Sequence, residues 1–226
     1  MWGTYFATLG DAAFGYGVAV AVLDTGIDYK HPELYGKVAY CIYTVGTKLY
    51  RGTDLRSCAD RNGHGTHVAG IVAASLDNVG VAGAAPKVRL MAVKALNDAG
   101  SGYYSDIAEG IIESVRAGAK ILSMSLGGSA DSSVLRDASY WAYQRGAVQV
   151  VAAGNSGDGN PATDNAPYPA RYSWVIAAAV DQNYATPTWS SDEPEVDVAA
   201  PGVNILSTYP AGGTPTCPAP PWRRPT

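Results

Sequence analysis

The stretch Val18–Gly26, VAVAVLDTG, determines the fold class of this chain. Its first six residues are apolar, and its first charged residue is Asp24. A strand of a parallel sheet is covered on both faces, so it shows a continuous apolar run instead of alternating polar and apolar residues. We predict that this stretch is a buried strand of a parallel sheet and that it ends at Asp24.

Strand and helix patterns alternate along the rest of the chain. Apolar runs predict further buried strands at 88–96, 119–128 and 147–155. Helical spacing predicts helices at 65–75, 105–118 and 133–146. In the second of these helices, Ser105 is the expected N-cap and Gly118 the expected C-cap. The alternating order predicts an α/β fold with right-handed crossovers and a parallel sheet covered by helices.

Composition excludes several classes of protein. The 226 residues are 47% apolar and 16% charged, which suits one globular domain with a substantial core. The net charge of −4 provides no basic face, so nucleic acid is not an expected partner. No apolar run reaches the roughly 18 residues of a membrane span, and the N-terminus lacks the pattern of a signal peptide. No GxGxxG follows a strand and no GKS or GKT occurs, which disfavours a nucleotide-binding domain. We expect no organic cofactor.

The three cysteines leave two possibilities open. Cys41 and Cys58 bracket a polar loop, whereas Cys217 lies near the end of the chain. A disulfide between the first two would contribute about 3 kcal/mol in the chain-entropy model. Two free thiols fit the sequence equally well. None of the cysteines has a partner at a spacing typical of zinc sites.

Polar residues follow three of the predicted strands. Asp24 ends the first, Ser125 lies near the end of another, and Asn155 follows VVAAG at a third. Reacting groups of parallel sheets gather at the carboxyl ends of the strands. We therefore expect these three side chains to share one rim of the sheet.

The motif NGHGTHVAG supplies a partner for Asp24. A buried carboxylate needs a hydrogen-bonding partner, and His64 lies at a glycine-flanked helix entry from which its ring can face the strand ends. A carboxylate bonded to one ring nitrogen leaves the other free as a general base. The alternatives are a turn aspartate and a loop histidine without catalytic roles. We assign His67 to packing rather than to a zinc site, and His31 to the surface.

Three motifs resemble those of the subtilisin-like serine proteases, the subtilase family. VAVLDTGID resembles the aspartate motif of that family, NGHGTHVAGIVAA its histidine motif, and VVAAGNSG the segment that carries its oxyanion-hole asparagine. Aspartate also precedes histidine here, as in subtilisin. The resemblance extends from about Gly17 to Gly213. It implies a three-layer fold with helices on both faces of a mostly parallel sheet, a serine endopeptidase, polypeptide substrates, a monomer, and an extracellular or cell-envelope location.

The resemblance also implies roles for individual residues. Asn155 would donate to the oxyanion of the tetrahedral intermediate, beside Asp24 and His64 as catalytic residues. Two segments would form edges that pair with an extended substrate, and two small residues would line the first-subsite pocket. These substrate-binding residues are Ser101, Gly102, Tyr104, Ser125, Leu126, Gly127, Ala152 and Gly154.

A weak cation site is implied in the same way. The segments YPARYSWVIAAAV and EVDVAAPG resemble a family site built from carbonyl oxygens and an aspartate. Oxygen ligands suit Ca²⁺ or a monovalent ion. The corresponding residues are Ala170, Tyr172, Val175 and Asp197. A capped loop without a cation is the alternative.

The serine motif of the family, GTSMASP or GTSMATP, has no match in this chain. Reading CPAPPWRRPT from the third base of each codon, however, allows the triplets that spell SGTSMATPH. We therefore expect the reading frame to slip near Thr214, so that residues 1–213 form an incomplete catalytic domain and 214–226 an out-of-frame tail. The chain as written is then expected to be inactive, and the alternative is a peptide-binding pseudoenzyme.

Overall fold

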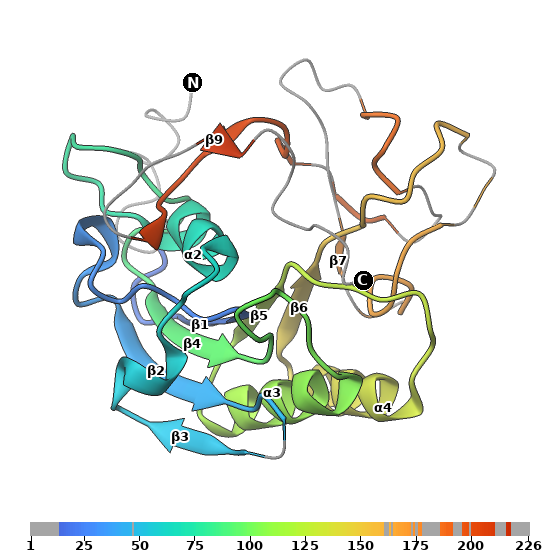
Figure 1. Ribbon diagram of the computed structural model, residues 1–226, viewed down its shortest axis with the longest axis horizontal. Helices are drawn as coiled ribbons and strands as arrows, with labels where there is room; N and C mark the ends of the chain where they lie inside the picture. The colour runs from blue at the N-terminus through green and yellow to red at the C-terminus, as the bar shows by residue number, and fades with distance from the viewer. Residues whose placement is uncertain are drawn as a thin grey trace.

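The computed structural model describes residues 14–46, 48–160, 163, 165–172, 174, 176–177, 186–191, 196–198, 200–210 and 216–217. Helices and strands alternate through most of this part of the chain (Figure 1). In chain order the elements are β1 (Ala19–Asp24), η1 (Pro32–Leu34), β2 (Val38–Tyr43), β3 (Tyr50–Gly52), η2 (Leu55–Cys58), α2 (His64–Ala73), β4 (Arg89–Lys94), α3 (Tyr104–Arg116), β5 (Ile121–Met124), α4 (Ser133–Gln144), β6 (Val148–Val151), β7 (Ile176–Ala177), β8 (Ile205–Leu206) and β9 (Thr216–Cys217).

The main sheet has seven strands in the order β3-β2-β4-β1-β5-β6-β7. All neighbouring strands in it run parallel except β2 and β3, which pair antiparallel. β1 lies in the middle of this sheet, where Asp24 is in register with Lys94 of β4. The predicted fold class, a mostly parallel α/β sheet, is therefore confirmed.

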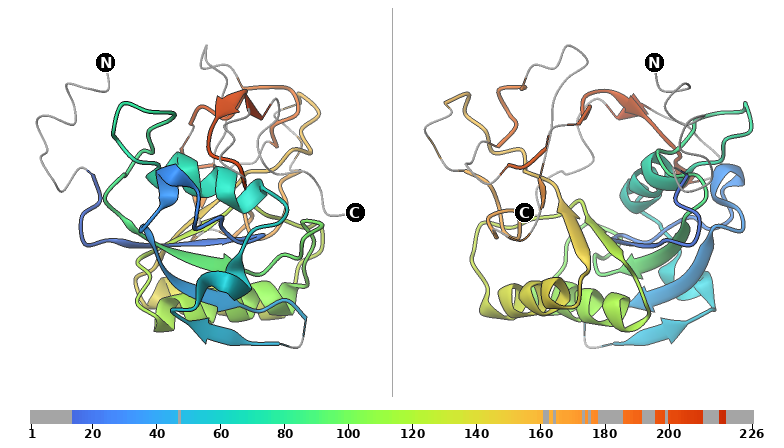
Figure 2. Two further views of the ribbon diagram at one scale, coloured as in Figure 1. Left: turned by 60° about the vertical axis from the view of Figure 1, so that its left-hand side comes forward. Right: turned by 180° about the vertical axis from the view of Figure 1, so that it is seen from behind.

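The sheet separates two hydrophobic cores, as its pleat requires. Ala21 and Leu23 of β1 pack with residues of α3 and α4, whereas Val20 and Val22 pack with residues of α2. Successive strand residues point to opposite faces, so a strand buried on both sides needs apolar residues at every position. The three layers are visible in Figures 1 and 2, with α2 on one side of the sheet and α3 and α4 on the other.

Three local predictions were wrong. The second predicted helix begins at Tyr104, its N-cap is Tyr103 without a side-chain cap, and Ser105 is already its second residue. Its C-cap is Ala117, and Gly118, with φ 95°, is the residue after the cap. His31 is buried, with 2% of its surface exposed, and so is not a surface residue. Its Nδ1 accepts a hydrogen bond from the backbone N–H of Glu33 and caps η1. The first N–H groups of a helix have no partner within the helix, so a polar side chain at its start can satisfy them.

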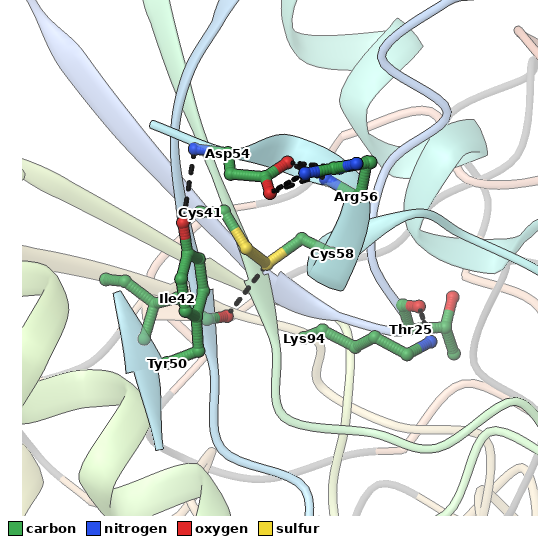
Figure 3. Close-up of a disulfide and its surroundings, with 8 residues drawn as sticks. All are labelled: Thr25, Cys41, Ile42, Tyr50, Asp54, Arg56, Cys58 and Lys94. Atoms are coloured by element: carbon green, nitrogen blue, oxygen red, sulfur yellow. Dashed lines mark hydrogen bonds and ion pairs between the residues drawn. A yellow bond between two sulfur atoms is a disulfide. The ribbon is translucent and has the colours of Figure 1, made fainter. Parts of the chain in front are cut away.

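Cys41 and Cys58 form a disulfide, which settles the alternative that their spacing left open (Figure 3). The bond joins β2 to the end of η2. The carbonyl of Cys58 also accepts a hydrogen bond of 2.9 Å from the backbone N–H of Ile27, just beyond β1. The segment that leads into α2 is thus attached to the sheet at two points.

Candidate active site

Asp24 and His64 meet where β1 ends and α2 begins. Nδ1 of His64 lies 2.6 Å from Oδ1 and 2.7 Å from Oδ2 of Asp24. The carboxylate is fully buried, whereas 18% of the imidazole is exposed. The backbone N–H of Thr25 donates a further bond of 2.7 Å to Oδ1 of Asp24. The aspartate therefore has the partner that a buried charge requires.

Glycine at position 65 allows this close approach. A Cβ at Gly65 would lie 2.1 Å from the carbonyl oxygen of Gly26 and 3.1 Å from Cβ of Asp24. The residue on the other side, Gly63, is the N-cap of α2 and has φ 105°, a conformation that side chains strongly disfavour. Both glycines that flank His64 thus serve the junction of strand and helix.

The electrostatic surroundings raise the pKa of His64. Burial alone would lower the pKa of its imidazole, but the negative charge of Asp24, the hydrogen bond to it and the charge of Asp60 together raise this pKa above 6.5. Its second ring nitrogen, Nε2, is buried and has no hydrogen-bond partner within the part of the chain that the structure describes. The arrangement leaves one nitrogen positioned by a carboxylate and the other available for proton transfer.

Asp60 was missed in the sequence analysis. Its carboxylate is buried and accepts hydrogen bonds from Thr25, Asn62, Gly63 and Thr66, the residues that flank the pair. An aspartate a few residues ahead of a helix is a familiar capping signal, and this signal could have identified it. The sequence alone does not show that Thr25, next to β1, shares the same carboxylate.

Residues 205–209 pack against α2 and the residues just before it. Nε2 of His67 lies 3.1 Å from the carbonyl oxygen of Ile205, and the burial of this imidazole lowers its pKa. Three further bonds come from hydroxyl groups: Ser207 donates to the carbonyl of His67, Thr208 to that of Thr66 and Tyr209 to that of Asn62. His67 is thus a packing residue between the helix and this segment.

The other predicted rim residues follow adjacent strands. Ser125 comes directly after β5 and Asn155 lies four residues beyond β6, and the sheet order places β1, β5 and β6 side by side. Because these strands are parallel, their carboxyl ends point to the same edge of the sheet. Asp24, Ser125 and Asn155 therefore belong to one rim.

Tyr104, at the start of α3, lies close to the segment that follows β5. A Cβ at Gly128 would lie 2.2 Å from the hydroxyl oxygen of Tyr104. Two hydrogen bonds join Ser101 to Asn97. The backbone N–H of Ser101 donates to Oδ1 of Asn97 at 3.1 Å, and the backbone N–H of Asn97 donates to the carbonyl of Ser101 at 2.8 Å. Of the remaining predicted residues, Gly102 is exposed, Leu126 is buried and Gly127 is half-buried.

Small residues follow β6 at the predicted first-subsite pocket. Ala152 and Gly154 are buried, and a Cβ at Gly154 would lie 2.5 Å from Cδ of Pro167 and 2.8 Å from Oγ of Ser191. Gly127 approaches the same proline, because a Cβ there would lie 2.7 Å from its Cγ. Pro167 therefore brings the segments after β5 and β6 together.

The predicted cation ligands are only partly described. Ala170 and Tyr172 are buried, Asp197 is exposed, and Val175 lies outside the described residues. The hydroxyl of Tyr172 donates to Asp131 at 3.2 Å. The described residues contain no group of three His, Cys, Asp or Glu side chains that could hold a metal ion.

Comparison with known proteins identifies the family. The Subtilase family, peptidase S8, matches residues 15–221. The chain belongs to the subtilase family. This subtilase is 44% identical to "Thermitase" of Thermoactinomyces vulgaris over 88% of its own length and 68% of that protein. It is 44% identical to "Subtilisin DY" of Bacillus licheniformis over 87% and 69%, and 43% identical to the "Major intracellular serine protease" of Bacillus subtilis (strain 168) over 87% and 61%.

Membership of this family of serine proteases makes polypeptides the substrate class. The matched region spans only about two thirds of each of these three relatives. No helix among the described residues is long and apolar enough to cross a membrane.

Proposed function

We propose that this subtilase has the catalytic apparatus of a serine endopeptidase that cleaves peptide bonds through an acyl-enzyme. The observation that carries the proposal is the contact of Nδ1 of His64 with both oxygens of Asp24, together with the buried Nε2 on the other side of the ring. A serine hydroxyl placed at Nε2 would lose its proton to this nitrogen as it attacks a peptide carbonyl. Asp24 would hold the ring in the required tautomer and stabilise the imidazolium that forms.

The carboxamide of Asn155 would stabilise the negative charge on the attacked carbonyl oxygen. Its position beyond β6, in the same parallel sheet as β1, supports this role. Loss of such a donor in this family costs roughly 10²–10³ in turnover, a magnitude taken from subtilisin itself. The proton held by His64 would then pass to the leaving amine, and water would repeat the sequence to release the acyl group. An extended substrate would lie between the segments around Ser101 and Ser125.

We further propose that the nucleophilic serine is encoded out of frame. The alternative reading of residues 217–226 places its codon across Pro220 and Pro221, and nine successive triplets agree with SGTSMATPH. Among the described residues, no serine hydroxyl bonds to Nε2 of His64. A polypeptide with the present tail, from 214 to 226, would then lack the nucleophile and be inactive. The alternative is a pseudoenzyme that binds peptides without cleaving them.

Location and cation binding are also proposals. The disulfide between Cys41 and Cys58 favours an oxidising compartment and hence an extracellular or cell-envelope protein. Ca²⁺ would be held by oxygen atoms of Ala170, Tyr172, Val175 and Asp197. A rise in the thermal midpoint on adding Ca²⁺, absent in Asp197→Asn, would support this site. We expect a monomer with neither nucleic-acid nor membrane partners.

Labelling with a fluorophosphonate tests the catalytic proposal. The reagent phosphonylates an activated serine, whose hydroxyl oxygen attacks phosphorus and displaces fluoride. We therefore expect no labelling of the chain as written and labelling of a version whose reading frame restores SGTSMATPH. The same restored version with His64→Ala is the control and should not react. A restored chain that folds but resists the reagent would contradict the proposed function. Labelling of the chain as written would contradict the proposed position of the nucleophile.

A further inference from the structure

Asp60 connects the residues on both sides of the Asp24–His64 pair. Its Oδ1 accepts hydrogen bonds from the hydroxyl of Thr25 at 2.9 Å and from the backbone N–H groups of Asn62 at 2.9 Å and Gly63 at 3.0 Å. Its Oδ2 accepts from Thr66, through the backbone N–H at 2.9 Å and the hydroxyl at 2.7 Å. All five donors belong to residues within two positions of Asp24 or His64.

Thr25 completes the connection between strand and helix. While its hydroxyl donates to Asp60, the same oxygen accepts a bond of 3.0 Å from the backbone N–H of Gly65. The residue after Asp24 is therefore bonded both to Asp60 and to the residue after His64. The hydroxyl of Thr66 extends the connection, because it accepts from the backbone N–H of Asp28 at 2.9 Å.

Only a carboxylate can satisfy this set of donors. The five bonds divide between two oxygens that both act as acceptors, and an ionised aspartate offers no donor. An asparagine would keep one acceptor oxygen, but its amide would point at a donor on the other side. Because Asp60 is buried, each donor that lost its acceptor would stay without water as a substitute, and an unsatisfied buried donor costs more free energy than a weak hydrogen bond.

From this geometry we propose that Asp60 is a positioning residue of the active site: it fixes the separation of β1 and α2 so that the carboxylate of Asp24 and the imidazole of His64 remain in contact. This role rests on the proposed function, because the contact matters to catalysis only if His64 is the general base. Asp60 does not touch the reacting atoms in this proposal. It acts through the backbone on either side of the pair.

The electrostatics agree with this placement. The negative charge of Asp60 adds to that of Asp24 in raising the pKa of His64. His67, one turn along α2, is a further titratable group that interacts with His64. On the β4 side, the ammonium group of Lys94 donates to the carbonyl of Thr25 and, at 2.8 Å, to the carboxylate of Asp98. The charge of Lys94 is therefore directed at Thr25 and Asp98 (Figure 3 shows Lys94 and Thr25).

Proton NMR of the full chain tests the role of Asp60 without any catalytic turnover. The Nδ1 proton of His64 should exchange slowly with water in the wild type, because Asp24 holds it. In Asp60→Asn, we expect its exchange to be about tenfold faster or more, the factor that corresponds to loss of a charged hydrogen bond, and the pKa of His64 to fall. Asp98→Asn is the matched control. It removes a nearby carboxylate whose oxygens accept hydrogen bonds from none of the residues next to His64, and it should behave as wild type.

A second pair of variants covers the case in which Asp60→Asn fails to fold. Thr25→Val removes the hydroxyl that joins β1 to Asp60 while retaining the charge of Asp60, and Thr25→Ser keeps the hydroxyl. Faster exchange in the valine variant but not in the serine variant supports the proposal.

Several outcomes would overturn it. Wild-type exchange in both Asp60→Asn and Thr25→Val would do so, and so would an effect of Asp98→Asn equal to that of Asp60→Asn. If Asp60→Asn is unfolded, equal rates in the two Thr25 variants are sufficient. Rapid exchange in the wild type itself would instead show that Asp24 does not hold the Nδ1 proton of His64. That result would contradict the proposed function on which this role rests.

Discussion

Replacing Gly65 by alanine tests how closely the strand and helix of the active site must approach. The new Cβ would lie 2.1 Å from the carbonyl oxygen of Gly26, where ordinary contacts begin at 3.4 Å, so the junction would have to open by about 1 Å. The obstacle is backbone and cannot rotate away. Overpacking of this kind costs about 1–3 kcal/mol, and this contact belongs at the upper end of that range.

Helix propensity opposes this cost but does not cancel it. Alanine is about 0.8–1.0 kcal/mol better than glycine within a helix. We therefore expect Gly65→Ala to lose about 2 kcal/mol of stability, a fall of about 4–8 °C in the thermal midpoint for a chain of this size. The opening should also separate Asp24 from His64, so the pKa of His64 should fall.

Gly110→Ala in α3 is the matched control. A Cβ there would lie 3.1 Å from the side chain of Val93, which can shift by a few tenths of an ångström. The gain in helix propensity should make this variant at least as stable as wild type. Thermal unfolding followed by circular dichroism gives both midpoints, and NMR titration gives the pKa of His64. A Gly65→Ala chain with the midpoint and pKa of wild type would refute the reasoning.

Three further outcomes are expected. Replacing Cys41 and Cys58 by serine should lower the free energy of unfolding by about 3 kcal/mol, measured in urea; an unchanged value would show that the disulfide does not constrain the unfolded chain. Because the folded pKa of His64 is raised above 6.5, its protonation stabilises the fold fully below pH 6.5, and this stabilisation is lost as pH rises through the folded pKa. His64→Gln should therefore cost more stability at pH 5 than at pH 9, and the opposite order would contradict the raised pKa. Thr208→Val removes the buried bond to the carbonyl of Thr66 and should cost about 1–3 kcal/mol in the same urea assay, whereas no loss would show that residues 205–209 do not hold α2.

The sequence predicted β1 well because its environment permits only one pattern. Both faces of this strand are covered, so every position from Val20 to Leu23 must be apolar, and the first charged residue marks its end. β2 and β3 were not predicted. β3 has only three residues at the edge of the sheet, where neither a continuous nor an alternating apolar pattern is required.

The pairing of Asp24 and His64 could be predicted from residue types, but the hydrogen bonds of Asp60 that hold the two segments together could not. A carboxylate at a strand end and a histidine at a helix entry suggest each other chemically. The position of Asp60 ahead of α2 is a capping signal, but the sequence does not show the approach of Thr25 from another element, on which the role of Asp60 at the site depends. His31 shows the same limit, since a histidine beside a proline gives no sign that its ring caps a buried turn.

The most direct test of the central claim is the pKa of His64 in the full chain and in Asp24→Asn. Burial lowers this pKa and Asp24 raises it, so the wild type should titrate above 6.5 and the variant, which keeps the burial but loses the charge, below 6.5. The low-field signal of the Nδ1 proton should disappear in the same variant. Equal titration of His64 in the two proteins would contradict the claim that these side chains form the catalytic pair.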